Sequence, residues 1–245
     1  MAVVTILTYH RIVPDGGRAF FYDVETTPFA RQVRRVAERT MATQGDARAG
    51  PGCGPVYLTF DDGTADHRRA ADLLSSQGLA GTFFAITGRL GTPGYLSEDD
   101  VRYMVAQGHR LGSHSVTHRR LTSLSAAELA EELVSSRAHL EALAQHTVDW
   151  FAPPGGVYSP AVLEAALRVG YQIVRTMDWG YAEVPLRGRV PCLPVFARYD
   201  MAMFDRLLEG QAPLWLHSVK NLLKRSVGLG IYTRLRNFGN TRVPR

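Results

Sequence analysis

Short β-branched and aromatic runs alternate along the chain with longer stretches that carry apolar residues every three or four positions. This alternation is typical of βα units around a parallel sheet. It predicts strands at 3–9, 56–60, 82–86, 110–113, 148–151, 171–176 and 214–216. It predicts helices at 29–41, 65–77, 98–106, 125–145, 160–169 and 201–208, and a loop from 181 to 194.

About seven βα units in one domain are one short of the eight units of a (β/α)₈ barrel and favour a barrel of the α/β class. An open doubly wound sheet is the alternative architecture. Such a sheet usually carries a glycine-rich phosphate-binding loop after its first strand. Here the first strand runs instead into Thr8-Tyr-His-Arg11, which favours the barrel.

The composition agrees with a globular fold, since 45% of the 245 residues are apolar and 21% are charged. Two cysteines are too few for a disulfide framework. No apolar run reaches the roughly 18–20 residues of a membrane span. Because the first residues lack the basic region and the small-residue cleavage site of a secretory signal, we expect a cytoplasmic protein.

The net charge of +5 is unevenly distributed. Residues 211–245 carry seven Lys or Arg and no acid, whereas residues 1–210 have a net charge of −2. We therefore expect a barrel at 1–218 and a basic tail at 219–245, and no nucleic-acid partner for the nearly neutral body. The tail mixes cations with apolar residues and could dock on an anionic surface, either the inner membrane leaflet or an acidic partner. The alternative is a solvated segment or one that packs on the barrel.

Polar residues gather where the predicted strands end, and in a parallel barrel those ends open on one face. Asp61 and Asp62 follow the second strand, and His114 and His118 follow the fourth. These residues could also have purely structural roles, with one aspartate capping the next helix after an Asp-Gly turn and the two histidines lying on the surface. Two histidines four apart together with a carboxylate also make a His₂Asp set, which suits a catalytic zinc-type site with an open position for water.

Two further polar residues fall at strand ends. His217 ends the last predicted strand, and Asp178 follows the sixth. An aspartate beside this histidine would raise its pKa and hold its tautomer, making it a usable general acid. A packed or solvated histidine and a turn-capping aspartate are the alternatives.

These residues, in this order, resemble the polysaccharide deacetylase family, also called NodB-homology or carbohydrate esterase family 4 proteins. The resemblance spans roughly residues 5–219. It rests on Thr59-Phe-Asp-Asp-Gly63, His114-Ser-Val-Thr-His118, Phe151-Ala-Pro-Pro-Gly-Gly156, Asp178-Trp179 and Trp215-Leu-His217, and the opening Leu7-Thr-Tyr-His-Arg-Ile12 looks similar to members acting on amino-sugar polymers.

The resemblance implies a distorted (β/α)₇ barrel and a role for each matched residue. Asp62, His114 and His118 would bind a divalent metal, commonly zinc, with Ser115 bracing the histidine loop. Asp61 would be the general base that activates water, and His217, oriented by Asp178, the general acid. The residues that would contact the substrate or the oxyanion of the tetrahedral intermediate are Tyr9, His10, Pro154, Gly155 and Trp179.

The implied function is removal of N-acetyl groups from an amino-sugar substrate. Alternatives are a deformylase or amidase acting on a lipid-linked sugar or a non-sugar, and a catalytically idle carbohydrate- or membrane-binding homologue. One departure bears on this choice, because the family often has an arginine paired with the catalytic aspartate where this chain has Ala152. Its loss should leave the pKa of Asp61 less depressed and its side chain less fixed.

Overall fold

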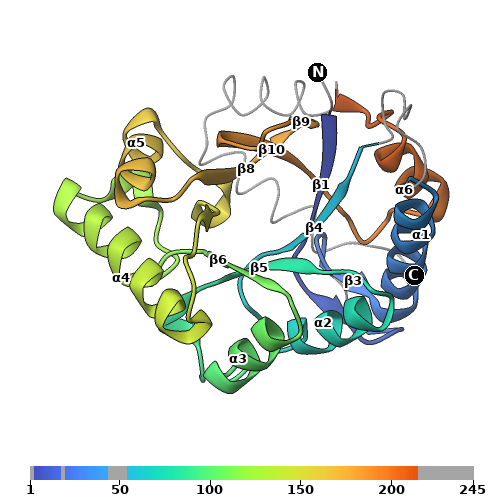
Figure 1. Ribbon diagram of the computed structural model, residues 1–245, viewed down its shortest axis with the longest axis horizontal. Coiled ribbons are helices and arrows are strands. Elements are labelled where there is room, and N and C mark those ends of the chain that lie inside the picture. The colour runs from blue at the N-terminus through green and yellow to red at the C-terminus, as the bar shows by residue number, and fades with distance from the viewer. Residues whose placement is uncertain (1–2, 18–19, 44–53, 215–245) are drawn as a thin grey trace.

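Seven parallel strands form a closed barrel in the computed structural model, which describes residues 3–17, 20–43 and 54–214. Each strand pairs with its neighbour in parallel, and the last strand pairs with the first, so the barrel closes (Figure 1). The (β/α)₇ prediction is therefore confirmed. The barrel strands are β1 (Val3–Tyr9), β4 (Val56–Phe60), β5 (Gly81–Ala85), β6 (Arg110–Ser113), β7 (Trp150–Phe151), β8 (Ile173–Trp179) and β10 (Gly188–Pro194).

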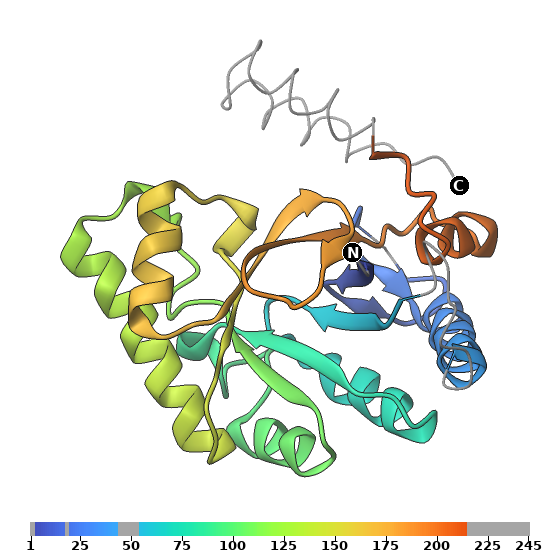
Figure 2. The same cartoon turned by 45° about the horizontal axis from the view of Figure 1, so that its top comes forward.

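Helices surround the barrel, and α4 and α5 lie side by side on its outer face (Figures 1 and 2). Local sequence sets their starts, because Ser97 and Ser125 each close a capping box with the acid three residues later. The helices are α1 (Thr26–Thr43), α2 (His67–Ser76), α3 (Glu98–Ala106), α4 (Ala126–Ala144), α5 (Pro160–Val169) and α6 (Met201–Leu208), with 3₁₀ turns at Thr87–Arg89, Leu121–Ser123 and Pro154–Gly156.

The seventh strand is not the one that the hydrophobic pattern predicts. The expected loop at 181–194 contains β9 (Ala182–Glu183) and the barrel strand β10, whereas Leu214 lies outside any strand and 215–216 lie outside the described residues. Pro191 argues against a strand at β10 in the sequence, because proline is rare inside the central strands of a sheet. In the structure the pairing of β10 with β8 shifts register between Val190 and Cys192, on either side of this proline.

The alternation of side chains along the strands separates two cores. The barrel interior is filled by a smaller cluster that includes Phe84, Trp150, Ala152 and Cys192. The larger cluster packs between the barrel and its helices. Gly112 on β6 leaves room for the Phe84 ring, because a Cβ at residue 112 would lie 2.4 Å from it.

Two short strands shape the segment between β1 and α1. β2 (Ile12–Val13) pairs in parallel with β3 (Val24–Glu25). This pairing holds residues 20–23 near the carboxyl end of β1, since Val24 N–H donates to the carbonyl of Arg11 at 2.9 Å.

Outside this segment, β9 pairs antiparallel with the start of β1. Among the helices in the described ranges, none has the length and apolar character needed to cross a membrane.

Candidate metal centre and active site

The two adjacent aspartates turn in different directions at the end of β4. Asp61 continues the strand, because its N–H donates to the Tyr9 carbonyl at 2.9 Å, and its side chain is buried. Asp62 has a φ of +79°, a conformation that a non-glycine residue adopts only when its surroundings hold it there. Gly63 follows with a φ of +68° and packs so closely on Ala85 that a Cβ would lie 3.1 Å from its Cα. This turn points the Asp62 carboxylate toward β6.

Asp62, His114 and His118 form a compact group of ligand atoms. Asp62 Oδ1 lies 3.4 Å from Nε2 of His114 and 3.4 Å from Nε2 of His118, and all three ligand atoms lie within 4.8 Å of one another. Tetrahedral zinc with bonds of roughly 2.0–2.2 Å separates its ligands by roughly 3.3–3.6 Å. One carboxylate oxygen and two imidazole nitrogens at this spacing fit a divalent metal, and three protein ligands leave a fourth position open.

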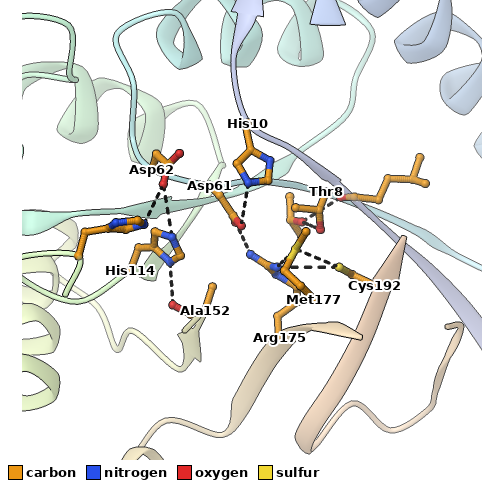
Figure 3. Close-up of polar contacts among 12 residues, drawn as sticks. Thr8, His10, Asp61, Asp62, His114, Ala152, Arg175, Met177 and Cys192 are labelled. Carbon is orange, nitrogen blue, oxygen red and sulfur yellow. Dashed lines mark hydrogen bonds and ion pairs between the residues drawn. The ribbon is translucent and has the colours of Figure 1, made fainter. Parts of the chain in front are cut away.

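The outer nitrogen of His114 is fixed by a backbone partner. Nδ1 of His114 lies 2.7 Å from the carbonyl oxygen of Ala152 (Figure 3). Because a carbonyl only accepts, Nδ1 carries the proton and the lone pair is on Nε2, which faces Asp62. This is the tautomer that a metal ligand needs.

The loop between the two histidines is braced from two sides. Ser115 and His118 both have positive φ values, +64° and +63°, and Ser115 Oγ accepts a 3.2 Å hydrogen bond from His118 N–H. This hydrogen bond is the contact through which Ser115 was expected to brace the loop. Glu132 of α4 accepts hydrogen bonds from the N–H groups of Val116 and Thr117, at 2.8 and 3.0 Å, and from the Thr117 hydroxyl.

Electrostatics keep Asp62 charged. Burial alone would raise the pKa of Asp62, but hydrogen bonds from His114 and His118 lower it well below its ordinary value. Burial alone would lower the pKa of His114, and the hydrogen bond to Asp62 and the charge of Asp61 raise it. In the absence of a metal, the two carboxylates therefore favour the cationic form of His114.

Asp61 is held by an arginine that was not among the predicted site residues. The guanidinium of Arg175, on β8, donates from Nη2 to Asp61 Oδ1, and Asp61 Oδ2 lies 3.9 Å from His10 Nε2 (Figure 3). Burial would raise the pKa of Asp61, but Arg175 and the nearby histidines lower it. The expectation of a less fixed Asp61 with a less depressed pKa was therefore wrong. The sequence feature that could have identified Arg175 is its charge within the predicted buried strand Tyr171-Gln-Ile-Val-Arg-Thr176.

A cavity of about 220 Å³ opens beside this group. Its aromatic wall is continuous with the barrel rim, because Tyr22 stacks on His10 with 4.6 Å between ring centroids. Phe20 is 51% exposed. The cavity is lined by His10, Arg11, Phe20, Phe21, Tyr22, Asp23 and Asp62.

One expected substrate residue lies elsewhere. Tyr9 is fully buried in the outer core, stacks on Phe60, and donates its hydroxyl to Gln32 of α1. The placement of Tyr9 at the substrate was therefore wrong, because the alternation along β1 turns Thr8, not Tyr9, into the barrel. His10, one residue beyond the strand, does line the cavity.

The remaining expected residues are placed as follows. Pro154 is buried in the turn after β7, and Gly155 is exposed there with a φ of +62°. Trp179 packs on Phe196, with 5.5 Å between ring centroids. Asp178 accepts hydrogen bonds from Thr176, Tyr158 and Arg189. His217 and the basic tail lie outside the described residues, so the expected pairing of Asp178 with His217 stays a prediction.

Comparison with known proteins gives a family match in the same region. Residues 48–174, which contain both aspartates and both histidines, match the model of the family described as polysaccharide deacetylase. The chain is 31% identical over 135 residues to the peptidoglycan-N-acetylmuramic acid deacetylase PdaA of Bacillus subtilis, covering 53% of this chain and 48% of that protein. It is 34% identical over 134 residues to a chitooligosaccharide deacetylase of Bradyrhizobium, covering 51% of this chain and 58% of that protein. The aligned part thus spans about half the length of these relatives.

Solved structures match the fold over a larger share of this chain than the sequence relatives do. The Streptococcus pyogenes deacetylase PplD, solved with acetate, gives a TM-score of 0.73 at 21% identity and covers 86% of this chain and 99% of that one. A polysaccharide deacetylase from Bacillus cereus gives 0.72 at 23% identity, with 84% and 69% coverage. At these identities the similarity concerns the barrel.

Proposed function

The chain belongs to the polysaccharide deacetylase family, and we propose that it is a metal-dependent hydrolase that removes N-acetyl groups from an amino-sugar substrate. One observation carries the proposal. The Asp62 carboxylate lies 3.4 Å from each of two imidazole nitrogens, and next to it is a second carboxylate, Asp61, which is buried and has a lowered pKa. A divalent metal bound by Asp62 and these two imidazoles would supply a Lewis acid next to a base, which is what the hydrolysis of an unreactive amide requires.

Asp62, His114 and His118 are the proposed ligands, and zinc is the metal that best suits one carboxylate and two imidazoles. A divalent ion bound there would polarise the amide carbonyl and lower the pKa of a water molecule. Asp61 is the proposed base. Its Oδ1 accepts from Arg175, and its Oδ2 lies 3.9 Å from Nε2 of His10, a residue that lines the cavity, so we take Oδ2 as the oxygen that accepts the proton.

The leaving nitrogen must be protonated for the tetrahedral intermediate to collapse, and we assign this step to His217 with Asp178 as its orienting partner. The family resemblance supports the assignment. Among the described residues, the histidine outside the ligand group that contacts Asp61 is His10, which makes it the second candidate for the acid. The backbone around Gly155, exposed after β7, is the proposed donor to the developing oxyanion.

The aromatic cavity supports a sugar substrate. Sugar rings present apolar C–H faces that pack against aromatic side chains, and Phe20 and Tyr22 offer such faces next to Asp62. Arg11 and Asp23, whose charged atoms lie 3.7 Å apart in the same wall, can hydrogen-bond hydroxyl groups. The relatives named for N-acetylmuramic acid and chitooligosaccharide deacetylation support the N-acetylated amino-sugar class.

A release assay tests the proposal. The purified chain is incubated with N-acetylglucosamine oligomers, peptidoglycan fragments and the matching N-formyl compounds, and the acetate and formate released are measured. We expect acetate release that a chelator abolishes and zinc restores, and none from Asp62→Ala. Faster release of formate than acetate would favour a deformylase, and unchanged activity of Asp62→Ala would refute the metal site.

A further inference from the structure

The His10 side chain makes few contacts that could hold it in the site. Its ring stacks on Tyr22, with 4.6 Å between the ring centroids, and its Nε2 atom lies 3.9 Å from Asp61 Oδ2, which is beyond hydrogen-bond distance. Its Nδ1 atom is buried, and within the described ranges it has no hydrogen-bond partner. The place of the ring beside Asp61 therefore depends on how the backbone of residue 10 is held.

The backbone of residues 10–12 is held by the start of α2. Nε2 of His67 donates to the carbonyl oxygen of His10, and Oδ2 of Asp66 accepts a 2.6 Å hydrogen bond from Ile12 N–H. The two contacts lie on either side of Arg11, whose side chain lines the cavity together with that of His10. The first residues of α2 thus fix a segment that is far away in the sequence and forms part of the cavity wall.

Asp66 gives up the usual role of an aspartate at its position. It is the N-cap residue of α2, where an aspartate side chain normally accepts a hydrogen bond from the first turn of its own helix. In the described structure its side chain makes no such bond, and its carboxylate accepts from Ile12 instead. A local preference that is abandoned in favour of a distant contact is expected at a functional site.

His67 is a buried histidine that none of the proposed steps uses. Its ring is fully buried, with its centroid 5.5 Å from that of Phe60 and 5.8 Å from that of Phe83. Because a carbonyl only accepts, Nε2 carries the proton, and Nδ1 is buried with no partner in the part of the chain that the structure describes. An unpaired polar atom among aromatic rings is costly, and the contact that this imidazole provides in return is the one to His10.

We propose that Asp66 and His67 are positioning residues that fix His10 beside Asp61. The inference rests on the proposed function in that Asp61 and the cavity are taken as the active site. The turn that carries Asp61 and Asp62 leads directly into α2. One short segment therefore sets the place of the base and, through two contacts, the place of the ring that faces it.

Double-mutant cycles with His10→Ala test the inference. Acetate release from an N-acetylglucosamine oligomer is measured for Asp66→Ala, Asp66→Asn and His67→Phe, each alone and combined with His10→Ala. Alone, Asp66→Ala and His67→Phe should lower kcat/KM about 5- to 50-fold, as for the loss of one hydrogen bond, and Asp66→Asn, which keeps an acceptor for Ile12 N–H, less than about threefold. Combined with His10→Ala, each should change kcat/KM less than about twofold, because the residue through which they act is gone.

Two variants control for a loss of stability. Asp72→Ala removes an exposed carboxylate from the same helix and should leave kcat/KM unchanged. His109→Phe removes another buried histidine, which accepts from Gly81 N–H and is not among the residues that line the cavity, and should lower the melting temperature without lowering kcat/KM. Bound zinc and melting temperature are measured for every variant. If Asp66→Ala does not fold, His67→Phe, which fills the same buried space, carries the test.

The outcomes separate this inference from the proposed function. A folded Asp66→Ala with wild-type kcat/KM, or losses as large in the His10→Ala background as in the wild type, would overturn the inference and leave the deacetylase proposal standing. A wild-type chain that releases no acetate would refute the proposed function. Crystal structures of the metal-free proteins then still decide the positioning role, since a His10 ring displaced from Asp61 in Asp66→Ala supports it and an unmoved ring overturns it.

Discussion

The Nδ1 atom of His114 donates a 2.7 Å hydrogen bond to the backbone carbonyl oxygen of Ala152. A ligand of the proposed metal, which directly follows β6, is thus oriented by the main chain of the residue that directly follows the neighbouring strand β7. The partner is a carbonyl, so the orientation survives changes of the side chain at residue 152. Strand pairing therefore sets the tautomer of His114 and the direction of its Nε2 lone pair.

Replacing His114 by alanine should remove metal binding. We expect zinc affinity, measured by competition with a chromophoric chelator, to fall by well over tenfold, because one of three protein ligands is lost. His139→Ala is the matched control, since His139 pairs with Glu98 on the helical surface. Zinc affinity that is equal in the two variants would contradict the proposed ligand set.

Glu132→Gln should loosen the histidine loop. Glu132 is 5% exposed and accepts three hydrogen bonds from Val116 and Thr117. We expect a loss of about 1–3 kcal/mol in the free energy of unfolding, as for hydrogen bonds to a buried charged group, and a roughly 10- to 100-fold loss of zinc affinity. Glu131→Gln, one residue away and exposed, should change neither quantity.

The contribution of Glu132 should depend on pH in one direction. Burial would raise its pKa, but the hydrogen bonds from Thr117 and Val116 lower it below the ordinary value of 4.5. The folded state then binds the proton less tightly than the unfolded state, so the stabilisation is complete above the unfolded pKa and is lost as pH falls through the folded pKa. In denaturant titrations of metal-free protein, the difference between wild type and Glu132→Gln should be full near neutrality and shrink below pH 4.5. If the difference in the free energy of unfolding between the two proteins grows on acidification, the pKa of Glu132 is not lowered by folding.

The proton donor can be identified by changing the leaving group. His217→Ala should slow amide hydrolysis by about 10²–10⁴-fold, the usual contribution of a general acid, and spare hydrolysis of 4-nitrophenyl acetate, whose leaving group needs no proton. His10→Ala is run in parallel. If His10→Ala shows this selective loss and His217→Ala does not, the acid is His10.

The aromatic cavity should control substrate binding. Phe20→Ala removes an exposed ring next to Asp62, so we expect KM for an N-acetylglucosamine oligomer to rise about 3- to 10-fold, as for the loss of one aromatic contact, with kcat nearly unchanged. Tyr103→Ala, which removes a ring from the surface of α3, serves as control. An unchanged KM in Phe20→Ala would place the sugar elsewhere.

Local patterns were enough to predict most of the fold. Capping residues and helical periodicity place α3, α4, α5 and α6 within one residue of the observed ends. Strand β10 was not predicted because Arg189 and Pro191 break the apolar pattern that marks a buried strand. Its place depends on pairing with both β1 and β8, which is a property of the closed barrel and not of the segment.

The candidate site was predictable where a residue's chemistry alone marks it. Asp61, Asp62, His114 and His118 stand out by type and spacing. The roles of Arg175 and Glu132 depend on which residues meet across neighbouring elements, and a single sequence does not contain that register. The wrong placement of Tyr9 has a simpler cause, since a shift of one residue along a strand exchanges the inner and outer faces.

Activity measured against zinc content tests the central claim most directly. Metal-free protein is titrated with zinc while acetate release from an N-acetylglucosamine oligomer is followed, for wild type and for Asp61→Asn. The account requires wild-type activity to rise in proportion to bound zinc and to level off at one ion per chain, with Asp61→Asn binding zinc equally but remaining at least about 100-fold slower. Acetate release that is independent of zinc, or an Asp61→Asn variant as fast as the wild type, would contradict it.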